Sequence, residues 1–381
     1  MENEAYIAFL KSAHFKGAGG IRVIIAGGGT GGHIFPAIAI ANALKKQHPA
    51  TEILFVGAKG KMEMEKIPEA GYKIEGLYIA GYNRSSFFKN ILLPFKLAKS
   101  FYQVRRILKA FKPDAVIGVG GYSSFPVLRL AQSDHIPTFI HESNSYAGKS
   151  NRLLAKKAVK IFVASYGMEK FFPQDKLLLT GNPIRNIFSK TISKKEALNY
   201  FGFKDNLKTV LVFGGSLGAK SINTAIKNNI NFFKTNNLQL IWQTGKEFAE
   251  AAALIEEQEK NIWSGAFINN MAEAYTAADY VIARSGAMTV SELCVVAKPV
   301  IFVPYPHAAE DHQTANANAL VQNNAALLVN DKDVDVKLFE VLLSLINDDS
   351  LASIFKENIA KYGNTNADEL IAAEILKSIH V

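Results

Sequence analysis

Short apolar runs rich in β-branched residues alternate with longer segments of helical periodicity from residue 21 onward. In the first half of the chain, these runs predict strands over residues 21–27, 52–57, 72–79, 114–121, 137–143 and 160–165. In the second half, they predict strands over residues 209–215, 238–245, 279–286, 299–305 and 325–330. Strands that alternate with helices form parallel sheets covered on both faces, so the pattern predicts an α/β protein.

The two halves of the chain begin alike. Residues 22–33 read RVIIAGGGTGGH and residues 209–220 read TVLVFGGSLGAK, so each half starts with an apolar strand, a glycine-rich turn and a helix. This repetition predicts two Rossmann-like units in tandem, joined near residues 177–186, where Gly181 and Pro183 interrupt regular structure. Ligands of such sheets bind beyond the carboxyl ends of the strands, so we expect the chemistry in an interdomain cleft.

Composition excludes few classes of protein. The 381-residue length fits two domains, and no apolar run approaches the roughly 20 residues that span a bilayer. Residues 1–20 lack a long apolar core, so we expect an extension outside the fold and not a signal peptide. The single cysteine, Cys294, fits a reducing compartment and is expected to be a buried structural residue. The net charge of +9 suggests an anionic partner: nucleic acid, a phospholipid surface or a nucleotide-sugar phosphate.

The first glycine-rich segment, residues 27–36 (GGGTGGHIFP), contains the G-x-G-x-x-G spacing of dinucleotide-binding sites. Such sites need an acidic residue about 20 residues further on, where the second strand ends. Here that position holds Lys59 and its neighbours, and Glu52 stands at the wrong end of the strand, which disfavours NAD. Two interpretations remain. The glycines let backbone amides approach another ligand beside Thr30 and His33, or they form a tight turn with a helix-capping histidine.

The second glycine-rich segment, residues 214–218, is suited to a diphosphate. Its glycines expose amides at the start of a helix, where the dipole favours an anion, and Ser216 adds a hydroxyl. No G-K-[ST] follows, so it is not a P-loop. Arg185 is a candidate for a further phosphate contact, although an exposed arginine is commonly only solvated.

Polar groups gather in two later segments. Residues 283–294 predict a strand end followed by a helix, in which Glu292 either accepts the hydroxyls of a ribose or only complements the helix dipole. Residues 304–320 predict a loop and a helix whose amides and carboxylates, Gln313 among them, suit sugar hydroxyls and lack metal-ligand spacing. The D-x-D of Asp333–Asp335 lies far along the chain from these segments and is expected at the surface.

Taken together, these segments resemble one family. The resemblance rests on GGGTGGHIFP, GGYSSFP, HESNSYAGKSNRLLA, GNPIR, GGSLGAKSIN, FINNMAEAYTAADYVIARSGAMTVSE and DHQTANA, in order over residues 21–326. The chain is similar to MurG-type peptidoglycan N-acetylglucosaminyltransferases of the GT-B superfamily. The resemblance implies a GT-B fold, with an N-terminal acceptor domain over residues 21–182, a UDP-GlcNAc domain over residues 183–363, and a final helix, 364–381, that returns to the first domain.

The resemblance also implies a reaction and its residues. GlcNAc would pass from UDP-GlcNAc to the C4 hydroxyl of MurNAc in the polyprenyl-linked lipid I, with inversion, to give lipid II. His33 would be the base or would orient the acceptor, with Glu142 and Tyr122 as rivals, and no metal or other cofactor would be needed. The implied donor contacts are Thr30, Gly31, Gly32, Asn144, Arg185, Ser216, Ile268, Ala287, Met288, Thr289, Glu292 and Gln313.

A membrane face is expected in residues 76–113, which hold eight basic residues and no acidic ones. Leu97, Phe101, Val104 and Leu108 recur at helical spacing and read as a core-facing stripe. The remaining apolar residues beside the bases suit anionic headgroups at the cytoplasmic face of the membrane, against the alternative of a core helix with a solvated basic face. The expected membrane residues are Phe87, Phe88, Ile91, Leu92, Phe95, Lys96 and Lys99.

Three other functions stay open from the sequence. The chain could be a different GT-B enzyme such as a glycolipid transferase, a UDP-GlcNAc 2-epimerase, or a nucleotide-sugar-binding protein without catalysis. No nucleic-acid-binding motif accompanies the charge, so a nucleic acid partner is not expected, whereas other cell-wall synthesis proteins are conceivable partners.

Overall fold

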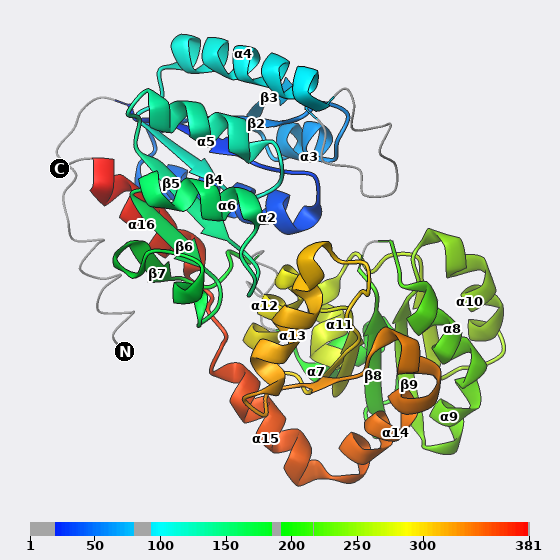
Figure 1. Cartoon of the computed structure of the whole chain (residues 1–381). Helices are drawn as coiled ribbons and strands as arrows, with labels where there is room; N and C mark the ends of the chain where they lie inside the picture. Colours follow the sequence, from blue (N-terminus) through cyan, green and yellow to red (C-terminus); the bar gives the residue numbers. More distant parts are fainter. Residues whose placement is uncertain (1–19, 80–92, 185–191, 216, 380–381) are drawn as a thin grey trace. The chain divides into compact units, whose positions relative to one another are not determined.

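The computed structural model describes residues 20–79, 93–184, 192–215 and 217–379 (Figure 1). By its internal contacts the chain divides into two compact units, Met1–Arg185 with Thr365–Val381, and Asn186–Asn364. We call them the first and the second unit and describe each by itself.

The first unit is built on a parallel seven-stranded sheet with the order β3-β2-β1-β4-β5-β6-β7. Its strands are β1 (Arg22–Ala26), β2 (Glu52–Ala58), β3 (Lys73–Leu77), β4 (Ala115–Gly118), β5 (Thr138–Glu142), β6 (Lys160–Val163) and β7 (Leu177–Leu179). Its helices are α2 (Gly31–Gln47), α3 (Glu63–Glu69), α4 (Leu93–Phe111), α5 (Ser124–Ser133), α6 (Lys149–Leu154) and α16 (Ala367–Ile379).

Alternating strand residues build two cores in this unit. Val23 and Ile25 of β1 face a cluster with α2, α3 and α16, whereas Ile24 and Ala26 face a cluster with α4, α5 and α6. The two-residue period of a strand sends successive side chains to opposite faces, so a sheet covered by helices on both sides needs strands that are apolar throughout. The sheet is therefore buried on both faces, as the sequence pattern predicted.

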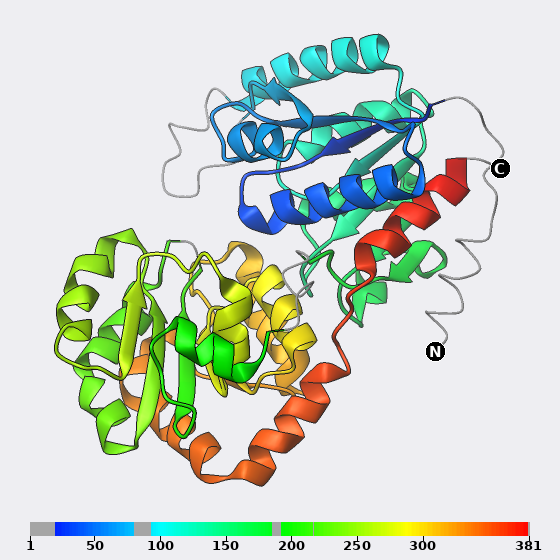
Figure 2. The ribbon, with the colours of Figure 1, turned by 180° about the vertical axis from the view of Figure 1, so that it is seen from behind.

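The last helix, α16, lies against α2 (Figure 2). Ile371, Ile375 and Leu376 are fully buried in the α2 cluster. Glu369 accepts a hydrogen bond from Lys46 at 2.7 Å, and its carbonyl accepts one from Gln47 at 2.8 Å. Since Lys46 is exposed, the burial of the apolar side chains is the main contribution of this contact to stability.

The second unit repeats the design with a parallel six-stranded sheet, β10-β9-β8-β11-β12-β13. Its strands are β8 (Lys208–Phe213), β9 (Leu238–Gln243), β10 (Ile262–Gly265), β11 (Tyr280–Ala283), β12 (Val300–Phe302) and β13 (Leu327–Leu328). Its helices are α7 (Lys194–Tyr200), α8 (Lys220–Asn228), α9 (Ile230–Thr235), α10 (Ala249–Glu256), α11 (Met271–Ala277), α12 (Ala287–Val296), α13 (His312–Val321), α14 (Val334–Asn347) and α15 (Asp349–Ala360). Both sheets contain the 3-2-1-4-5-6 order of dinucleotide-binding folds.

Two strands were missed in the sequence. β7 has three residues at one edge of the first sheet, and β10 has four at one edge of the second. Edge strands pair on one side only and are partly exposed, so they can be short. β7 is only three leucines long, and β10 has two large apolar residues followed by Ser264 and Gly265, so neither forms the longer apolar run of a buried strand. Most of the predicted strands also extend past the observed ones at their carboxyl ends, whereas β2 ends one residue later than predicted, at Ala58.

Candidate functional site

The loop that follows β1 holds His33 by its ring. His33 is in the first turn of α2, and its Nδ1 lies 3.1 Å from the carbonyl oxygen of Gly28 and 3.3 Å from Thr30 Oγ1. A carbonyl oxygen can only accept, so this contact requires Nδ1 to carry the hydrogen. Nε2 is then the basic nitrogen of the neutral ring, which is the state a general base needs.

A second glycine turn, after β4, closes against this loop. A Cβ on Gly121 would come within 2.4 Å of the Gly28 carbonyl oxygen, and a Cβ on Gly120 within 2.7 Å of His33 Nε2. Both glycines have positive φ, +101° and +83° for Gly120 and Gly121. The two turns therefore interlock at contacts that only glycine permits, and they fix the position of the histidine.

His141, in β5, is a further histidine close to His33 that the sequence did not single out. Its side chain is fully buried, and its Nε2 has no hydrogen-bond partner. The pKa of His141 is lowered to about 4, mainly by burial, with a smaller contribution from the charge of His33 and against a Gly181 backbone contact that raises it. His141 is therefore a neutral buried ring at physiological pH, and proximity to His33 is its link to the site.

Glu142 organises the loop that follows β5. Its buried carboxylate accepts hydrogen bonds from the Asn144 N–H at 3.1 Å, the Gly148 N–H at 3.0 Å and Asn151 Nδ2 at 2.8 Å. Asn144 Nδ2 adds a fourth contact at 3.3 Å. A carboxylate engaged by this many donors is held in place, which suits a structural group better than a mobile base.

Tyr122 stands beside the first glycine loop, with Gly29 as a neighbour. Burial raises the pKa of its phenol, and the charge of Glu63 raises it further. A phenol whose pKa lies above 10 is protonated at neutral pH, so Tyr122 is suited to donating a hydrogen bond and poorly suited to accepting a proton.

In the second unit, the glycine turn after β8 packs against the turn after β9. A Cβ on Gly218 would come within 2.0 Å of the Thr244 carbonyl oxygen, and a Cβ on Gly245 within 2.2 Å of that of Leu217. The turn leads into α8, which begins at Lys220. Ser216 and Arg185, the two expected diphosphate contacts, lie outside the described residues.

Gln243, at the end of β9, is a site residue that the sequence did not reveal. Its Nε2 donates to the Gly215 carbonyl at 2.9 Å, and its Oε1 accepts the N–H of Ile268 at 2.9 Å. One buried amide thereby ties the glycine turn to Ile268, one of the expected donor contacts. The Ile268 N–H is engaged, so the carbonyl is the backbone group this residue can offer to a base.

The first turn of α12 consists of Ala287, Met288 and Thr289, after the N-cap residue Gly286. The amides of a ten-residue helix are free to meet an anion at this end. One turn further on, the Glu292 carboxylate accepts a hydrogen bond from the Tyr275 hydroxyl of α11 at 2.9 Å. Tyr275 is buried at 1% exposure, so it holds the carboxylate from the core side.

Gln313, in the first turn of α13, is also fixed from within. Its Oε1 accepts the Tyr305 N–H at 3.0 Å, and its carbonyl accepts the Ser285 hydroxyl at 2.8 Å. These bonds join the turns after β11 and β12. These two bonds use oxygen atoms of Gln313, so its side-chain amide nitrogen is the donor that suits a sugar hydroxyl.

Arg284, at the end of β11, ties together the surroundings of α12. It is 8% exposed and donates to the carbonyls of Val303 and Pro304 at 2.9 Å, to Asp331 at 2.6 Å and to Ser221 at 3.0 Å. All these partners are within the second unit. Arg284 is thus a structural cation, fully engaged in holding four segments at one edge of the sheet.

Among the residues that the structure describes, no cluster of three or more His, Cys, Asp or Glu side chains could hold a metal ion. Asp333 ends a short 3-10 turn and is half-buried, and Asp335 is exposed in α14. Cys294 is buried in α12, where burial raises the pKa of its thiol to about 12, so it is an unreactive core residue.

Comparison with known proteins gives this arrangement a family. The profile of the Glycosyltransferase family 28 N-terminal domain matches residues 23–163, and that of the Glycosyltransferase family 28 C-terminal domain matches residues 209–373. A protein of Parabacteroides distasonis is 49% identical over 94% of this chain and 98% of its own length. It is named UDP-N-acetylglucosamine--N-acetylmuramyl-(pentapeptide) pyrophosphoryl-undecaprenol N-acetylglucosamine transferase. The chain belongs to this transferase family.

Solved structures agree with the assignment. The crystal structure of MurG from Acinetobacter baumannii is 28% identical, has a TM-score of 0.76, and covers 94% of this chain and 99% of that one. The UDP-GlcNAc 2-epimerase of Neisseria meningitidis, bound to UDP-GlcNAc, covers 94% and 100% with a TM-score of 0.64. It is 17% identical, so that likeness shows the fold alone. The predicted GT-B fold and the predicted MurG-type family are both confirmed.

Helix α4 of this family 28 transferase has the stripe that the sequence predicted. Val104 and Leu108 are buried, and Phe101 packs edge-on against Phe125 with ring centroids 6.5 Å apart. On the other side, Phe95 is 73% exposed, and Lys96 and Lys99 are exposed beside it. The other expected membrane residues, Phe87, Phe88, Ile91 and Leu92, lie outside the described residues. No helix in the described part of the chain is long and apolar enough to cross a membrane.

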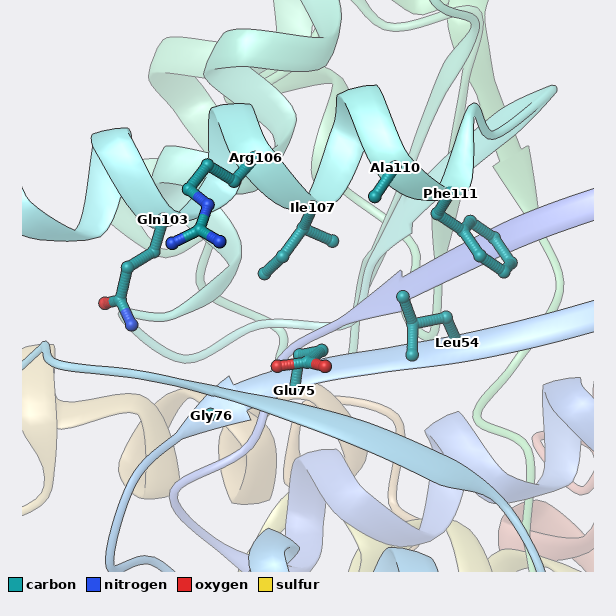
Figure 3. A pocket seen from close by; sticks show the side chains of 8 residues that line it. All are labelled: Leu54, Glu75, Gly76, Gln103, Arg106, Ile107, Ala110 and Phe111. Atoms are coloured by element: carbon teal, nitrogen blue, oxygen red, sulfur yellow. The ribbon is translucent and has the colours of Figure 1, made fainter.

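A groove of about 490 Å³ lies beneath α4, away from the residues expected to bind the donor. Figure 3 shows Ile107, Ala110 and Phe111 of α4 facing Leu54 of β2, with Glu75 of β3 below Arg106. Gln103 at one end accepts the Tyr78 N–H at 2.9 Å. None of the site residues predicted from the sequence lines this groove, so it is not part of the candidate active site.

Proposed function

We propose that this family 28 transferase moves GlcNAc from UDP-GlcNAc to the C4 hydroxyl of MurNAc in undecaprenyl-pyrophosphoryl-MurNAc-pentapeptide, giving lipid II of peptidoglycan. The observation that carries the proposal is the 49% identity, over 94% of the chain, to a protein named for this transfer. The reaction inverts the anomeric carbon. The acceptor oxygen bonds to C1 of GlcNAc, the bond from C1 to the diphosphate oxygen breaks, and UDP leaves with the electron pair.

We assign donor binding mainly to the second unit. The carboxylate of Glu292, held by Tyr275 at 2.9 Å, is suited to the two ribose hydroxyls because an anion accepts both. The Ile268 carbonyl is suited to the N–H of uracil, since the Ile268 N–H is already bonded to Gln243. The amide nitrogen of Gln313 is assigned to a GlcNAc hydroxyl, and Asn144 to another.

Stabilisation of the leaving diphosphate is assigned to helix α12 and to two side chains. The N–H groups of Ala287, Met288 and Thr289 lie at the positive end of that helix. Ser216 and Arg185 are retained as further contacts. With these groups to meet the charge, we propose that transfer requires no metal, and we expect activity to persist in excess EDTA.

The base is assigned to His33. The contact of its Nδ1 with the Gly28 carbonyl leaves Nε2 to accept the proton of the attacking hydroxyl. Thr30, Gly31 and Gly32 surround it at the start of α2 and are assigned to closing around donor and acceptor. Glu142 and Tyr122 are the weaker candidates, because the former is engaged by several donors and the latter is held protonated.

We also propose that the enzyme works at the cytoplasmic surface of the membrane, where its polyprenyl-linked acceptor lies. The support is the basic outer side of α4, with Phe95 exposed beside Lys96 and Lys99. Basic residues near an anionic surface contribute about 1 kcal/mol each, which gives reversible attachment.

The deciding experiment is transfer of labelled GlcNAc from UDP-GlcNAc to a lipid I analogue, with UDP-GalNAc and UDP-glucose as competitors. We expect transfer to lipid I and preference for UDP-GlcNAc. His33→Gln is expected to lower kcat by roughly 10²–10⁴ with UDP binding intact, whereas His48→Gln, beyond the end of α2, serves as the control. Protein that binds UDP but transfers no sugar would refute the proposal and favour a non-catalytic binding role.

A further inference from the structure

The first glycine loop contains an anion supplied by the chain itself. Glu63 begins α3, and its side chain is buried at 1% exposure. Its Oε2 accepts the N–H of Gly29 at 2.8 Å, and its Oε1 accepts the N–H of Ala58, at the end of β2, at 2.9 Å. In dinucleotide-binding folds the amides of this loop meet a pyrophosphate, but here a carboxylate already occupies one of them.

The loop backbone is closed tightly on this carboxylate. A Cβ on Gly28 would lie 2.4 Å from the carboxyl carbon of Glu63, and a Cβ on Gly57 would lie 2.5 Å from its Cγ. Gly28 and Gly29 have φ of +143° and +89°, which side-chain-bearing residues rarely adopt. Two successive glycines leave this stretch of backbone with little preference of its own, so its contacts set its orientation. These contacts are the Glu63 carboxylate, which accepts the Gly29 N–H, and the Gly120 carbonyl, which accepts the Gly28 N–H at 3.3 Å.

The peptide unit between Gly28 and Gly29 connects Glu63 with His33. The Gly29 N–H that donates to Glu63 and the Gly28 carbonyl that contacts His33 Nδ1 at 3.1 Å belong to the same planar amide. An anion on the N–H side polarises the amide and increases the negative charge on its oxygen. Rotation of this plane would replace the carbonyl facing His33 with an N–H and would reverse which ring nitrogen carries the hydrogen.

We infer that Glu63 is a positioning residue for the transfer reaction, acting on His33 through the Gly28–Gly29 peptide. The inference rests on the proposed role of His33 as the base. Glu63 holds the carbonyl toward Nδ1, so the hydrogen of the neutral ring stays on Nδ1 and Nε2 remains able to accept the hydroxyl proton. The acidic partner that orients a catalytic histidine directly in a Ser-His-Asp triad acts here through one backbone amide.

Other titratable groups lie near the same loop and affect the pH dependence expected for His33. Tyr122 is near Gly29, and the buried His141 is close enough to His33 that the charged forms of the two rings repel each other. Neither reverses the expected direction. Loss of the Glu63 charge removes stabilisation of the His33 imidazolium, so the acidic limb of the kcat/KM profile moves to lower pH in Glu63→Gln.

The first measurement is made on the wild-type protein. The nitrogen chemical shifts of ¹⁵N-labelled histidine in the wild-type protein report which nitrogen of His33 carries the hydrogen, with the signal assigned by its loss in His33→Gln. We expect the Nδ1–H form. A predominant Nε2–H form would overturn the inference, and this reading depends neither on substrate nor on activity.

The second measurement compares Glu63→Gln with Glu65→Gln, an exposed residue of α3 whose ion pair is with Lys66 at 3.4 Å. We expect Glu63→Gln to lower kcat at least tenfold, to shift the acidic limb and to raise the Nε2–H fraction, with the KM for UDP-GlcNAc within twofold of wild type. Glu63→Asp, which keeps the charge but shortens the reach, is expected to lower kcat without moving the limb as far.

A purely structural role gives a different result. Glu63→Gln would then lower the melting temperature while the pH profile and the histidine tautomer stay as in the wild type, and the inference would be wrong. Absence of transfer by the wild-type protein would instead refute the proposed function, while the tautomer measurement would still decide the role of Glu63.

Discussion

Buried carboxylates that hold loop backbone are the main feature of the first unit at the residue scale. Glu63 accepts N–H groups of Gly29 and Ala58, and Glu142 accepts those of Asn144 and Gly148. Each anion accepts backbone N–H groups in a loop or, for Ala58, at the end of a strand, where the regular hydrogen bonds of strands and helices stop. The loops that carry His33 and Asn144 are thereby held in defined conformations, which preorganised catalysis requires.

In the second unit, a carboxylate is itself held in place: the Tyr275 hydroxyl donates a hydrogen bond to Glu292. We predict that Tyr275→Phe raises the KM for UDP-GlcNAc roughly threefold to tenfold with kcat nearly unchanged, because only part of the roughly 1.5–3 kcal/mol of a hydrogen bond to a charged group, about 0.7–1.4 kcal/mol, is passed on to donor binding. Steady-state kinetics with varied UDP-GlcNAc tests this. Tyr280→Phe is the matched control, since its hydroxyl bonds Lys208 in β8. An unchanged KM in Tyr275→Phe would mean that Glu292 needs no support.

His141 predicts a pH dependence of stability. Its pKa is about 4 in the fold against 6.5 as the ordinary value, so between these pH values the unfolded chain binds more protons. Its contribution is therefore complete above pH 6.5 and is lost as the pH falls toward 4, by roughly 3 kcal/mol in total. Denaturant unfolding between pH 7 and 4.5 should show a smaller decline for His141→Gln than for wild type. An identical slope would contradict the prediction.

At the scale of elements, α4 combines two roles on one helix. Its inner stripe of Val104 and Leu108 packs into the core, while Phe95, Lys96 and Lys99 remain outside. Lys99 lies 4.1 Å from the centre of the Tyr78 ring, which steadies that side chain. Since the packing residues and the basic residues occupy different sides, the charges can be altered without disturbing the core.

We predict that Lys96→Glu/Lys99→Glu weakens binding to vesicles containing anionic lipid by tenfold or more, because each base contributes about 1 kcal/mol and each reversal adds repulsion. Cosedimentation at low and high salt measures the effect, which should shrink at high salt. Lys332→Glu/Lys337→Glu, with the same change of charge in the second unit, should bind as wild type does. Equal losses in both variants would indicate a general charge effect and no membrane face on α4.

At the scale of the whole molecule, each unit depends on segments distant in sequence. The first unit is completed by α16, whose Leu376 is fully buried against α2. We predict that Leu376→Ala destabilises the protein by roughly 2–5 kcal/mol, whereas Lys377→Ala, at an exposed neighbouring position, changes stability by less than about 0.5 kcal/mol. Chemical denaturation followed by circular dichroism is the measurement. A small effect of Leu376→Ala would show that α16 is not integral to the first unit.

The sequence by itself determined the regular elements and the chemistry class. Its apolar runs predict strands, because a strand in a sheet buried on both faces is apolar along its whole length. Its glycine-containing turns mark where the chain changes direction at the carboxyl ends of those strands. It also identified α12 as a helix that begins at Ala287 with Glu292 within it. Local signals of this kind depend only on neighbouring residues, so they can be read without the fold.

Only the tertiary structure decided which side chains hold which loops. Glu63 is 34 residues from Gly29 along the chain, and Gln243 is 25 residues from Ile268, yet each pair is hydrogen-bonded. The edge strands β7 and β10 also depended on a neighbouring strand for their existence, since β7 has only three residues and β10 has only two large apolar ones. Such contacts form because parallel sheets bring the carboxyl ends of distant strands together, and sequence spacing alone contains no record of that proximity.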